Sequence, residues 1–495
     1  MVCLIIVSLH SERQHLWLGA SARRPPGWYQ PGVRALFLRR SPAGMCVLQA
    51  TEEAALARRA ATTVPQGGES PPSDPNTREA WSCGSPPAIS LGAMEALHMR
   101  VTQAGFWTTF LLAMLAISSP PQAQQDPGPR PGAEAGDMLK GLSGQQKALF
   151  QQGREEFVAA EEIAEGLGPR FNLDSCAGCH AHPVVGGSSP PVNPQVAFLT
   201  RRGGAANQLP TFVRPDGPMV EIRFKRDDKV HQLFAIEAQG CALKVGPFPP
   251  DQVTLRIPTP TFGLGLVEQI PDTVILAQRS QEQARKQGLG IGGVPQQQGD
   301  GRMGRFGWKA QHRDLEAFAG EAYNVEMGIT NELNPTEIEP DPRCQFVPVP
   351  NSLPEGNAPS AVELFAAFMR GLAPPAPPPA THPGRVVFDA VGCGLCHTPS
   401  LGGVPLFSDL LLHTMGTALD DSITQGVAQG QQFRTAPLWG VGQRLFFLHD
   451  GRTSDLVEAI NAHASSGSEA NGVIAELRKL TPAAVQDLLN FLRAL

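Results

Sequence analysis

Two copies of a Cys-x-x-Cys-His pattern constrain this chain more than any other feature of its sequence. They are CAGCH at residues 176–180 and CGLCH at residues 393–397. Cysteines three positions apart lie on one face of a helical turn, where both thiols can add to the vinyl groups of a haem while the adjacent histidine binds its iron. A zinc site would need further Cys-x-x-Cys pairs, and the sequence contains none. The two motifs therefore predict two covalently bound haem c groups.

The motifs assign a role to each of their residues. The predicted thioether-forming residues are Cys176, Cys179, Cys393 and Cys396, and the predicted proximal iron ligands are His180 and His397. The group at the sixth coordination position then decides what each haem does. A strong protein ligand there makes an electron-transfer centre, whereas an open position lets the iron react with a peroxide or another small oxidant.

Several side chains downstream of the second motif could be the sixth ligand of its iron. They are His413, Met415, His449 and His463. His463 lies near the end of a predicted helix, residues 455–464, in which Leu456, Ala459 and Ile460 share one apolar face. That face would present His463 to a haem; the alternative is a histidine on the protein surface.

The composition predicts short helices joined by irregular loops. The 495 residues include 52 Gly and 47 Pro but only two Tyr. Helical spacing is found in four segments, residues 142–167 with Ser143 as the cap, 314–323, 361–371 and 482–495, and a short hairpin is expected within 220–257. The expected fold is mainly α, with two cytochrome c-like haem domains, long irregular loops and a few short strands.

A secretion signal precedes the first motif. Residues 94–123 contain a basic start at Arg100, an apolar run over residues 106–117 and small residues near Ala123, followed by Gln, Pro and Gly. The run is short for a bilayer and has no positively charged stop, so we expect cleavage, no membrane span afterwards, and a periplasmic location. Because a signal acts at an N-terminus, residues 1–93 are interpreted as a non-native or disordered leader.

The remaining chain divides at a proline-rich run. We expect the following parts: a leader at 1–93, a signal peptide at 94–123, an N-terminal haem domain with insertions at 137–371, a linker at 372–383, and a C-terminal cytochrome c domain at 384–495. The net charge of −6 and the lack of a basic stripe exclude nucleic acid as an indicated partner. Cys241 and Cys344 form either a disulfide or two buried free thiols.

Four sequence segments resemble a known family. FRTAPLWGVGQRLFFLHDGRTSDLVEAINAH, residues 433–463, resembles the C-terminal haem domain of bacterial di-haem cytochrome c peroxidases. SCAGCHAHPVVGGSS, RIPTPTFGLGLVEQIPD and GRFGWKAQHRDLEAFAGEAYNVEMGIT are similar to the related di-haem oxidoreductase family, whose members are labelled peroxidase or thiol oxidoreductase. The likeness covers residues 142–495.

The resemblance implies roles for individual residues. His463 takes the distal position of the C-terminal haem, with Met415, in HTMG, as the competing ligand. Trp308 matches a tryptophan that assists electron transfer between the haems, although it could equally serve core packing. Glu326, in NVEMG, matches a glutamate that shuttles protons beside the N-terminal haem, with a structural salt bridge as the alternative. A calcium ion between the domains is also expected, although no contiguous acidic loop demonstrates it.

The sequence departs from the peroxidase pattern at the N-terminal haem. A glutamine expected near Phe318 is missing, and no histidine stands at the distal position. That haem is therefore open and reactive, or its ligand is another residue such as His231 or Met219. His182 lies too close to the proximal ligand to reach the far face of the same iron, so we interpret it as structural.

Three functions follow from these patterns. The leading one is a periplasmic, peroxidase-like di-haem oxidoreductase that takes electrons from a small cytochrome or a cupredoxin and passes them to peroxide or another small oxidant. The second is a non-enzymatic electron-transfer or accessory protein in which both irons are six-coordinate. The third, a thiol oxidoreductase using Cys241 and Cys344, lacks a Cys-x-x-Cys redox pair.

Overall fold

The chain divides into two compact units, Met1–Arg100 and Val101–Leu495. The computed structural model describes four short strands in the first unit and, in the second, residues 124–132, 135–201, 209–225, 233–236, 243–245, 251–338 and 347–495. In the first unit, β1 (Leu4–Ile6), β2 (Trp17–Gly19), β3 (Ala35–Arg40) and β4 (Cys46–Leu48) form an antiparallel sheet in the order β2-β1-β3-β4. The leader and signal-peptide assignments stay predictions.

Two packed helices frame the N-terminal motif. Helix α2 (Gly144–Val158) begins at a capping box in which Ser143 accepts from the Gln146 amide, as its sequence predicts. It packs on α9 (Ala361–Gly371) so closely that a Cβ at Gly153 would collide with the carbonyl oxygen of Leu364. The bounds of α9 are those expected from its spacing.

Helix α2 ends nine residues before its predicted end at residue 167. Beyond Val158 the chain turns away, and the Glu161 amide donates to the carbonyl of Asp174 at 2.8 Å. The Tyr323 hydroxyl also donates to the Glu161 carboxylate at 2.9 Å. These two contacts with distant residues replace the hydrogen bonds that would have continued the helix.

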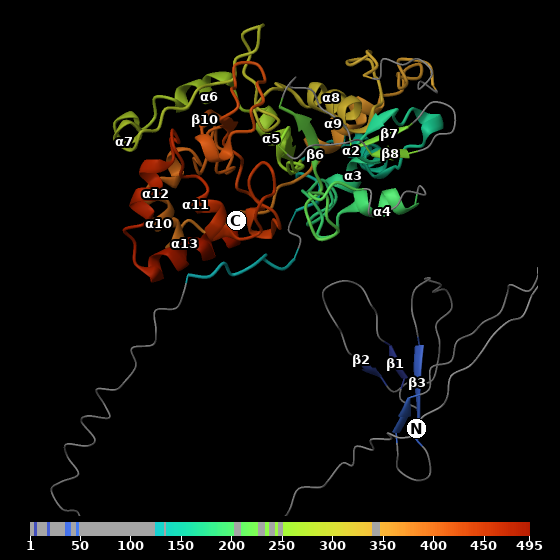
Figure 1. Ribbon diagram of the computed structural model, residues 1–495, viewed down its shortest axis with the longest axis horizontal. Helices are drawn as coiled ribbons and strands as arrows, with labels where there is room; N and C mark the ends of the chain where they lie inside the picture. The colour runs from blue at the N-terminus through green and yellow to red at the C-terminus, as the bar shows by residue number, and fades with distance from the viewer. Residues whose placement is uncertain are drawn as a thin grey trace, which may run out of the picture. The chain divides into compact units, whose positions relative to one another are not determined.

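A third helix completes the N-terminal half. Helix α8 (Leu315–Met327) begins at Asp314, whose side chain accepts from the Ala317 amide, and ends at Gly328, which has a φ of 76°. It packs against α9. The shorter α3 (Cys176–Cys179), α4 (Pro194–Arg201) and α5 (Leu264–Glu268) belong to the same half. Figure 1 shows α2, α3, α8 and α9 gathered in this part of the unit.

Short strands replace the single hairpin expected within residues 220–257. Strand β6 (Glu221–Phe224) pairs antiparallel with β9 (Val253–Arg256), and between them in sequence β7 (Phe234–Ile236) pairs with β8 (Leu243–Val245). Strand β5 (Arg170–Phe171) adds to β7. The outer pair joins residues that flank an insertion, a nested arrangement that alternation of apolar residues does not predict.

The C-terminal half is built around two close-packed helices. Helix α10 (Pro383–Val391) crosses α13 (Pro482–Ala494) at Gly384, where a Cβ would collide with the Asp487 carbonyl oxygen. The Phe388 and Phe491 rings lie 5.5 Å apart between them. The other elements of this half are α11 (Leu456–Asn461), α12 (Asn471–Leu477), β10 (Leu412–Thr414) and β11 (Gln432–Arg434). Helices α6 (Asp272–Gln278) and α7 (Gln283–Leu289) precede α8 in sequence.

One hydrophobic core connects the two halves. Its largest cluster contains Phe157 and Phe368 from the N-terminal half and Leu406, Leu411 and Trp439 from residues 384–495. A second cluster lies under α10 and α13. The mainly α fold with short strands is confirmed, while the division into two haem domains stays a prediction. None of the helices in the described part of the chain has the length and apolarity that a membrane crossing needs.

The segment of residues 124–132, which precedes α2 in the sequence, is bound to the C-terminal half. Its Asp126 carboxylate accepts hydrogen bonds from Arg493 at 2.5 and 2.6 Å and from the Leu456 amide at 2.8 Å. The Arg130 amide donates to the Gly442 carbonyl at 2.7 Å. Of the proline-rich run at 372–383, Leu372 is buried and accepts from the Gly263 amide.

Candidate haem sites

The N-terminal motif forms one turn of helix at the edge of a cavity. In α3, Ser175 caps the turn by accepting from the Gly178 amide at 3.2 Å, and both cysteines are free thiols that line the cavity. Burial raises the pKa of Cys176 to about 12 and that of Cys179 well above its usual value. The thiols are therefore protonated at neutral pH and do not behave as redox-active thiolates.

Both motif histidines are oriented in the same way. His180 donates from Nδ1 to the carbonyl of Gly187 at 3.1 Å, and His397 donates from Nδ1 to the carbonyl of Phe407 at 3.2 Å. Burial lowers the pKa of each imidazole to about 4, so both rings are neutral at pH 7. A carbonyl that fixes the proton on Nδ1 leaves the Nε2 lone pair free for a metal.

The cavity beside the first motif, called here the N-terminal cavity, contains about 1040 Å³ of empty space. Its walls include Cys176, Cys179, His180, Met219, Glu221, Arg223, Arg256, Trp308, Phe318, Tyr323 and Glu326. A ligand bound at His180 would therefore have charged groups as well as apolar ones around it.

Glu326 lies in the last turn of α8 with its side chain in this cavity. One carboxyl oxygen accepts from Asn172 Nδ2 at 2.7 Å. Burial, and then the neighbouring charge of Glu221, raise the pKa of Glu326 well above its usual value. The structure thus brings the glutamate singled out in the sequence into the same cavity as His180, as a carboxyl whose pKa is raised by burial and by Glu221.

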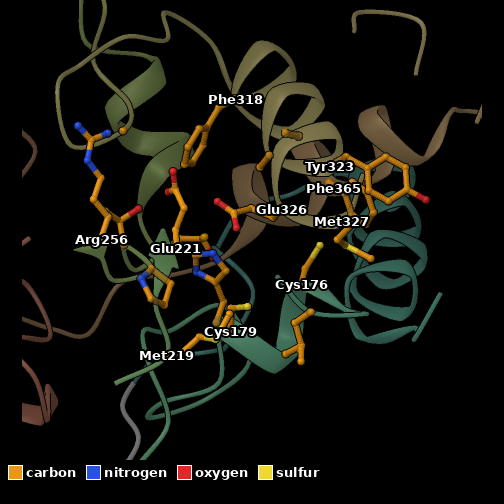
Figure 2. A pocket seen from close by; sticks show the side chains of 18 of the residues that line it. Cys176, Cys179, Met219, Glu221, Arg256, Phe318, Tyr323, Glu326, Met327 and Phe365 are labelled. Atoms are coloured by element: carbon orange, nitrogen blue, oxygen red, sulfur yellow. The ribbon is translucent and has the colours of Figure 1, made fainter. Parts of the chain in front are cut away.

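A second carboxylate, Glu221, was not singled out in the sequence. It projects from β6, and Figure 2 shows its carboxyl group beside that of Glu326, with which it forms a hydrogen bond. Glu221 also pairs with Arg223 on the same strand face. In the β6–β9 register it lies opposite Arg256. One sequence signal could have identified Glu221: it stands two residues before Arg223 in the strand sequence EIRF, so the two opposite charges lie on one strand face.

A buried charge network lies behind Arg256. The Arg256 guanidinium donates to Asp421 at 2.6 and 3.2 Å and to Gln425 at 2.7 Å. The Lys309 ammonium, which is fully buried, lies 3.1 Å from Asp421 and donates to three backbone carbonyls. Burial lowers the pKa of Lys309 to about 8. One carboxylate therefore neutralises two cations at the edge of the N-terminal cavity.

The cavity beside the second motif, called here the C-terminal cavity, contains about 1400 Å³ of empty space and is mostly apolar. It is lined by Cys393, Cys396, His397, His413, Met415, Phe433, Arg444, His449, His463 and Glu469, with aliphatic residues from the surrounding helices. The structure thus brings together in one cavity all four downstream candidates for the sixth ligand of the second iron.

His463 is prepared to bind a metal in the same way as the motif histidines. Its Nδ1 donates to the Ala459 carbonyl at 2.8 Å, which leaves Nε2 free, and burial lowers its pKa. After burial, the charge of His463 is the next factor that lowers the pKa of His397, which places the two rings near each other. Met415 lines the same cavity, so the choice between His463 and Met415 stays a prediction.

The other two histidines of this cavity are engaged by neighbours. His413 contacts Asp409 through Nε2 at 3.0 Å and Glu469 through Nδ1 at 2.7 Å, so neither ring nitrogen is free. Burial opposes its charge, yet the nearby Cys396 and Asp409 raise the pKa of His413 well above its usual value. His449 stacks on Phe433, and burial lowers its pKa to about 4.

Trp308 lines both cavities. Its indole Nε1 donates to the Ile257 carbonyl at 2.9 Å, and its ring meets His449 edge-on with centroids 6.4 Å apart. A smaller cavity, called here the middle cavity, shares Trp308 with the other two and is also lined by Arg434, Arg444 and Trp439. The role of Trp308 in electron transfer between two haems stays a prediction.

The remaining sequence candidates have mixed outcomes. Met219 is 2% exposed and lines the N-terminal cavity, whereas His231 lies outside the described residues. The His182 ring is hydrogen-bonded through Nε2 to the Gln443 carbonyl at 2.9 Å, in keeping with a structural role. Phe318 lines the N-terminal cavity where the glutamine was expected.

Two further predictions are not tested by the described residues. Cys241 and Cys344 both lie outside them. Among the residues that are described, no group of three or more His, Cys, Asp or Glu side chains is arranged to hold a metal ion. The disulfide and the calcium ion therefore stay predictions.

Comparison with known families gives a match over the C-terminal part of the chain. A family model described as "di-haem oxidoreductase, putative peroxidase" matches residues 208–495, more than half of the chain. The matched range contains the second motif together with Glu221, Trp308, Glu326 and His463, and begins after His180. No curated protein matches the chain.

Proposed function

Because the chain belongs to the di-haem oxidoreductase family, we propose that it is a periplasmic c-type cytochrome with peroxidase-like activity. The C-terminal cavity would hold a haem for electron exchange with a small cytochrome or cupredoxin, and the N-terminal cavity would hold a haem for the reduction of peroxide or another small oxidant. The observation that carries this proposal is the pair of carboxyl groups, Glu326 and Glu221, in the cavity of His180, with the pKa of Glu326 raised by burial.

The residues of both cavities fit a haem. Each cavity offers two free thiols and one neutral imidazole whose Nε2 lone pair is available. Cys176, Cys179 and His180 would hold one haem, and Cys393, Cys396 and His397 the other. When bound, the haem would supply an iron that accepts electrons singly and delivers them to an oxidant.

The carboxyl pair supplies protons. Reduction of hydrogen peroxide to two water molecules consumes two electrons and two protons. The raised pKa of Glu326 favours the protonated form of its carboxyl, which can donate a proton within the cavity, and Glu221, hydrogen-bonded to it, can return one. Asn172 fixes the position of Glu326, and Arg223 balances the charge of Glu221. These residues replace the missing glutamine of the peroxidase pattern.

The C-terminal cavity suits electron transfer. His463 and His397 both present a free Nε2 to an apolar cavity, and two strong ligands make an iron that exchanges electrons without binding substrate. Met415 as the ligand would give the same role at a higher potential. Trp308, which lines both cavities, would provide a protein route between them.

One observation favours a second function, non-enzymatic electron transfer. Met219 is buried and lines the N-terminal cavity, and its thioether sulfur could occupy the sixth position of that iron. Both haems would then be six-coordinate. Glu326 and Glu221 would serve only to position neighbouring groups.

Electron paramagnetic resonance of the oxidised holoprotein separates these functions. We expect one high-spin and one low-spin ferric signal, and turnover of hydrogen peroxide with a reduced cytochrome as donor. Glu326→Gln should slow turnover by about 10²–10⁴-fold with the spectra unchanged, while Glu316→Gln, on the same helix but outside the cavity lining, should not. Two low-spin signals that are unaffected by peroxide would support the electron carrier.

A further inference from the structure

A buried arginine, Arg434, and a half-buried one, Arg444, lie close together in the wall between the cavities. Arg434 and Arg444 both line the middle cavity with Trp308, and Arg444 also lines the C-terminal cavity. Burial lowers the pKa of each guanidinium to about 10, and the charge of Arg444 contributes to the shift of Arg434. Two like charges are therefore held near each other away from solvent.

The protein satisfies these two cations unequally. Arg434 donates from Nε to the Gly307 carbonyl at 2.9 Å and from Nη1 to the Thr435 carbonyl at 3.2 Å. The Nε atom of Arg444 is buried and has no hydrogen-bond partner in the part of the chain that the structure describes. Within that same part, no carboxylate forms an ion pair with either arginine.

Most buried cations in the described part of the chain have a carboxylate partner. Arg256 lies 2.6 Å from Asp421, Lys309 lies 3.1 Å from the same side chain, and Arg493 lies 2.5 Å from Asp126. Lys286 and Arg434 instead donate to backbone carbonyls. The Nε atom of Arg444 has neither kind of partner among the described residues, and a buried charge left unpaired is costly. Arg444 therefore points to an anion that is not part of the protein.

We infer that Arg444 is a carboxylate-binding site that holds a propionate group of the haem in the C-terminal cavity. A haem carries two propionates, and Arg444 lines the cavity that contains Cys393, Cys396 and His397. A guanidinium binds a carboxylate through two parallel N–H donors, which supplies the unpaired Nε with an acceptor. Arg434, held by backbone carbonyls, adds positive charge to the site.

This inference depends on the haem and not on peroxidase activity. It holds for an electron carrier as well, because both functions need a haem in the C-terminal cavity. The same guanidinium could instead bind a small anion from solution, such as chloride. A propionate and a free anion can be distinguished, because only a free anion would make the midpoint potential of the haem depend on the anion concentration.

Redox titration of the holoprotein tests the inference. Wild type, Arg444→Gln, Arg444→Lys and the control Arg478→Gln would be titrated by spectroelectrochemistry over pH 5–9, at high and low chloride and constant ionic strength. Arg478 is exposed, so its variant removes one charge from the same half without touching the cavity. Pyridine haemochrome assays confirm two haems per chain. The C-terminal haem is identified by its absence from a variant with Cys393 and Cys396 replaced by Ser.

A paired propionate predicts a specific pattern. A positive charge next to a haem favours its reduced form, so Arg444→Gln should lower the reduction equilibrium constant at pH 8 by about tenfold, which is 59 mV for one electron. The midpoint potential of the C-terminal haem in Arg444→Gln should also become pH-dependent as the unpaired propionate takes up a proton. The midpoint of Arg444→Lys should lie between those of wild type and Arg444→Gln, and the midpoint of Arg478→Gln should match wild type.

Two results would overturn the inference. One is a midpoint in Arg444→Gln that equals wild type at every pH. The other is a wild-type midpoint that shifts with chloride, which would identify a free anion as the ligand. If Arg444→Gln does not retain haem, wild type and Arg444→Lys still test the inference. We expect the midpoint potential of wild type to be independent of chloride and nearly independent of pH. A wild-type midpoint that changes with pH as a propionate titrates would contradict the assignment.

Discussion

The His449 imidazole stacks on the Phe433 ring, with ring centroids 4.3 Å apart and an angle of 23° between the planes. The Lys309 ammonium lies over the Phe433 ring, 4.1 Å from the ring centroid. On the His449 side, the Trp308 ring meets the imidazole edge-on. Aromatic rings in contact thus extend from the buried Lys309 and Asp421 charges to the tryptophan that lines both cavities. The wall between the cavities is rigid and polarisable.

Replacement of Trp308 should slow electron exchange between the haems. In Trp308→Phe the Ile257 carbonyl loses its donor and the larger ring is removed from the wall. We expect both haems to be retained and the inter-haem transfer rate, measured by stopped-flow absorbance, to fall by roughly tenfold, equal to about 1.4 kcal/mol in the barrier. Trp439→Phe, a second buried tryptophan of the middle cavity, is the control and should leave the rate unchanged.

Removal of His463 should change the ligation of the C-terminal iron. Its free Nε2 is the predicted sixth ligand, so His463→Ala should convert the low-spin ferric signal to high spin in electron paramagnetic resonance. Met415→Leu is the matched variant, because Met415 lines the same cavity. A low-spin signal that survives in His463→Ala and disappears in Met415→Leu would assign the methionine instead.

The raised pKa of Glu326 predicts how stability depends on pH. Between the ordinary value of 4.5 and the raised one, the folded protein binds more protons than the unfolded chain, so the free energy of unfolding falls as pH increases. Glu326→Gln removes this dependence, and its stability relative to wild type should rise with pH in urea titrations. A stability difference that stays constant from pH 4 to pH 8 would contradict the assignment of a protonated carboxyl.

Loss of the Asp421 carboxylate should destabilise the fold. Asp421→Asn leaves Arg256 and Lys309 buried without a counter-charge, which should reduce the free energy of unfolding by about 3–5 kcal/mol. Its exposed neighbour Asp420 provides the control, since Asp420→Asn should cost far less. If the two variants lower the free energy of unfolding equally in denaturant titrations, burial of the charge network does not determine how much Asp421 contributes to stability.

Local features of the site could be predicted from the sequence. The Cys-x-x-Cys-His spacing placed two thiols and one imidazole at each cavity, because one helical turn determines their geometry. Helix caps at Ser143 and Asp314 were likewise local signals, read from a few consecutive residues.

Other features depend on contacts between distant residues and could not be predicted. Glu221 joins Glu326 only because β6 pairs with β9 across an insertion and α8 packs nearby. Arg444 shows no distinguishing pattern in the sequence, since its significance lies in the carboxylate that is missing around it. Helix α2 ends early because Asp174 and Tyr323, far along the chain, bind the residues after it.

The ion pair between Asp126 and Arg493 joins residues 367 positions apart in the sequence. Asp126 can meet Arg493 only after nearly the whole of the intervening chain has been made. Contacts of such long range are slow to form because the intervening loop must first be closed. We therefore expect this ion pair to form late in folding, and to hold the segment that precedes α2 against the C-terminal half only in the finished protein.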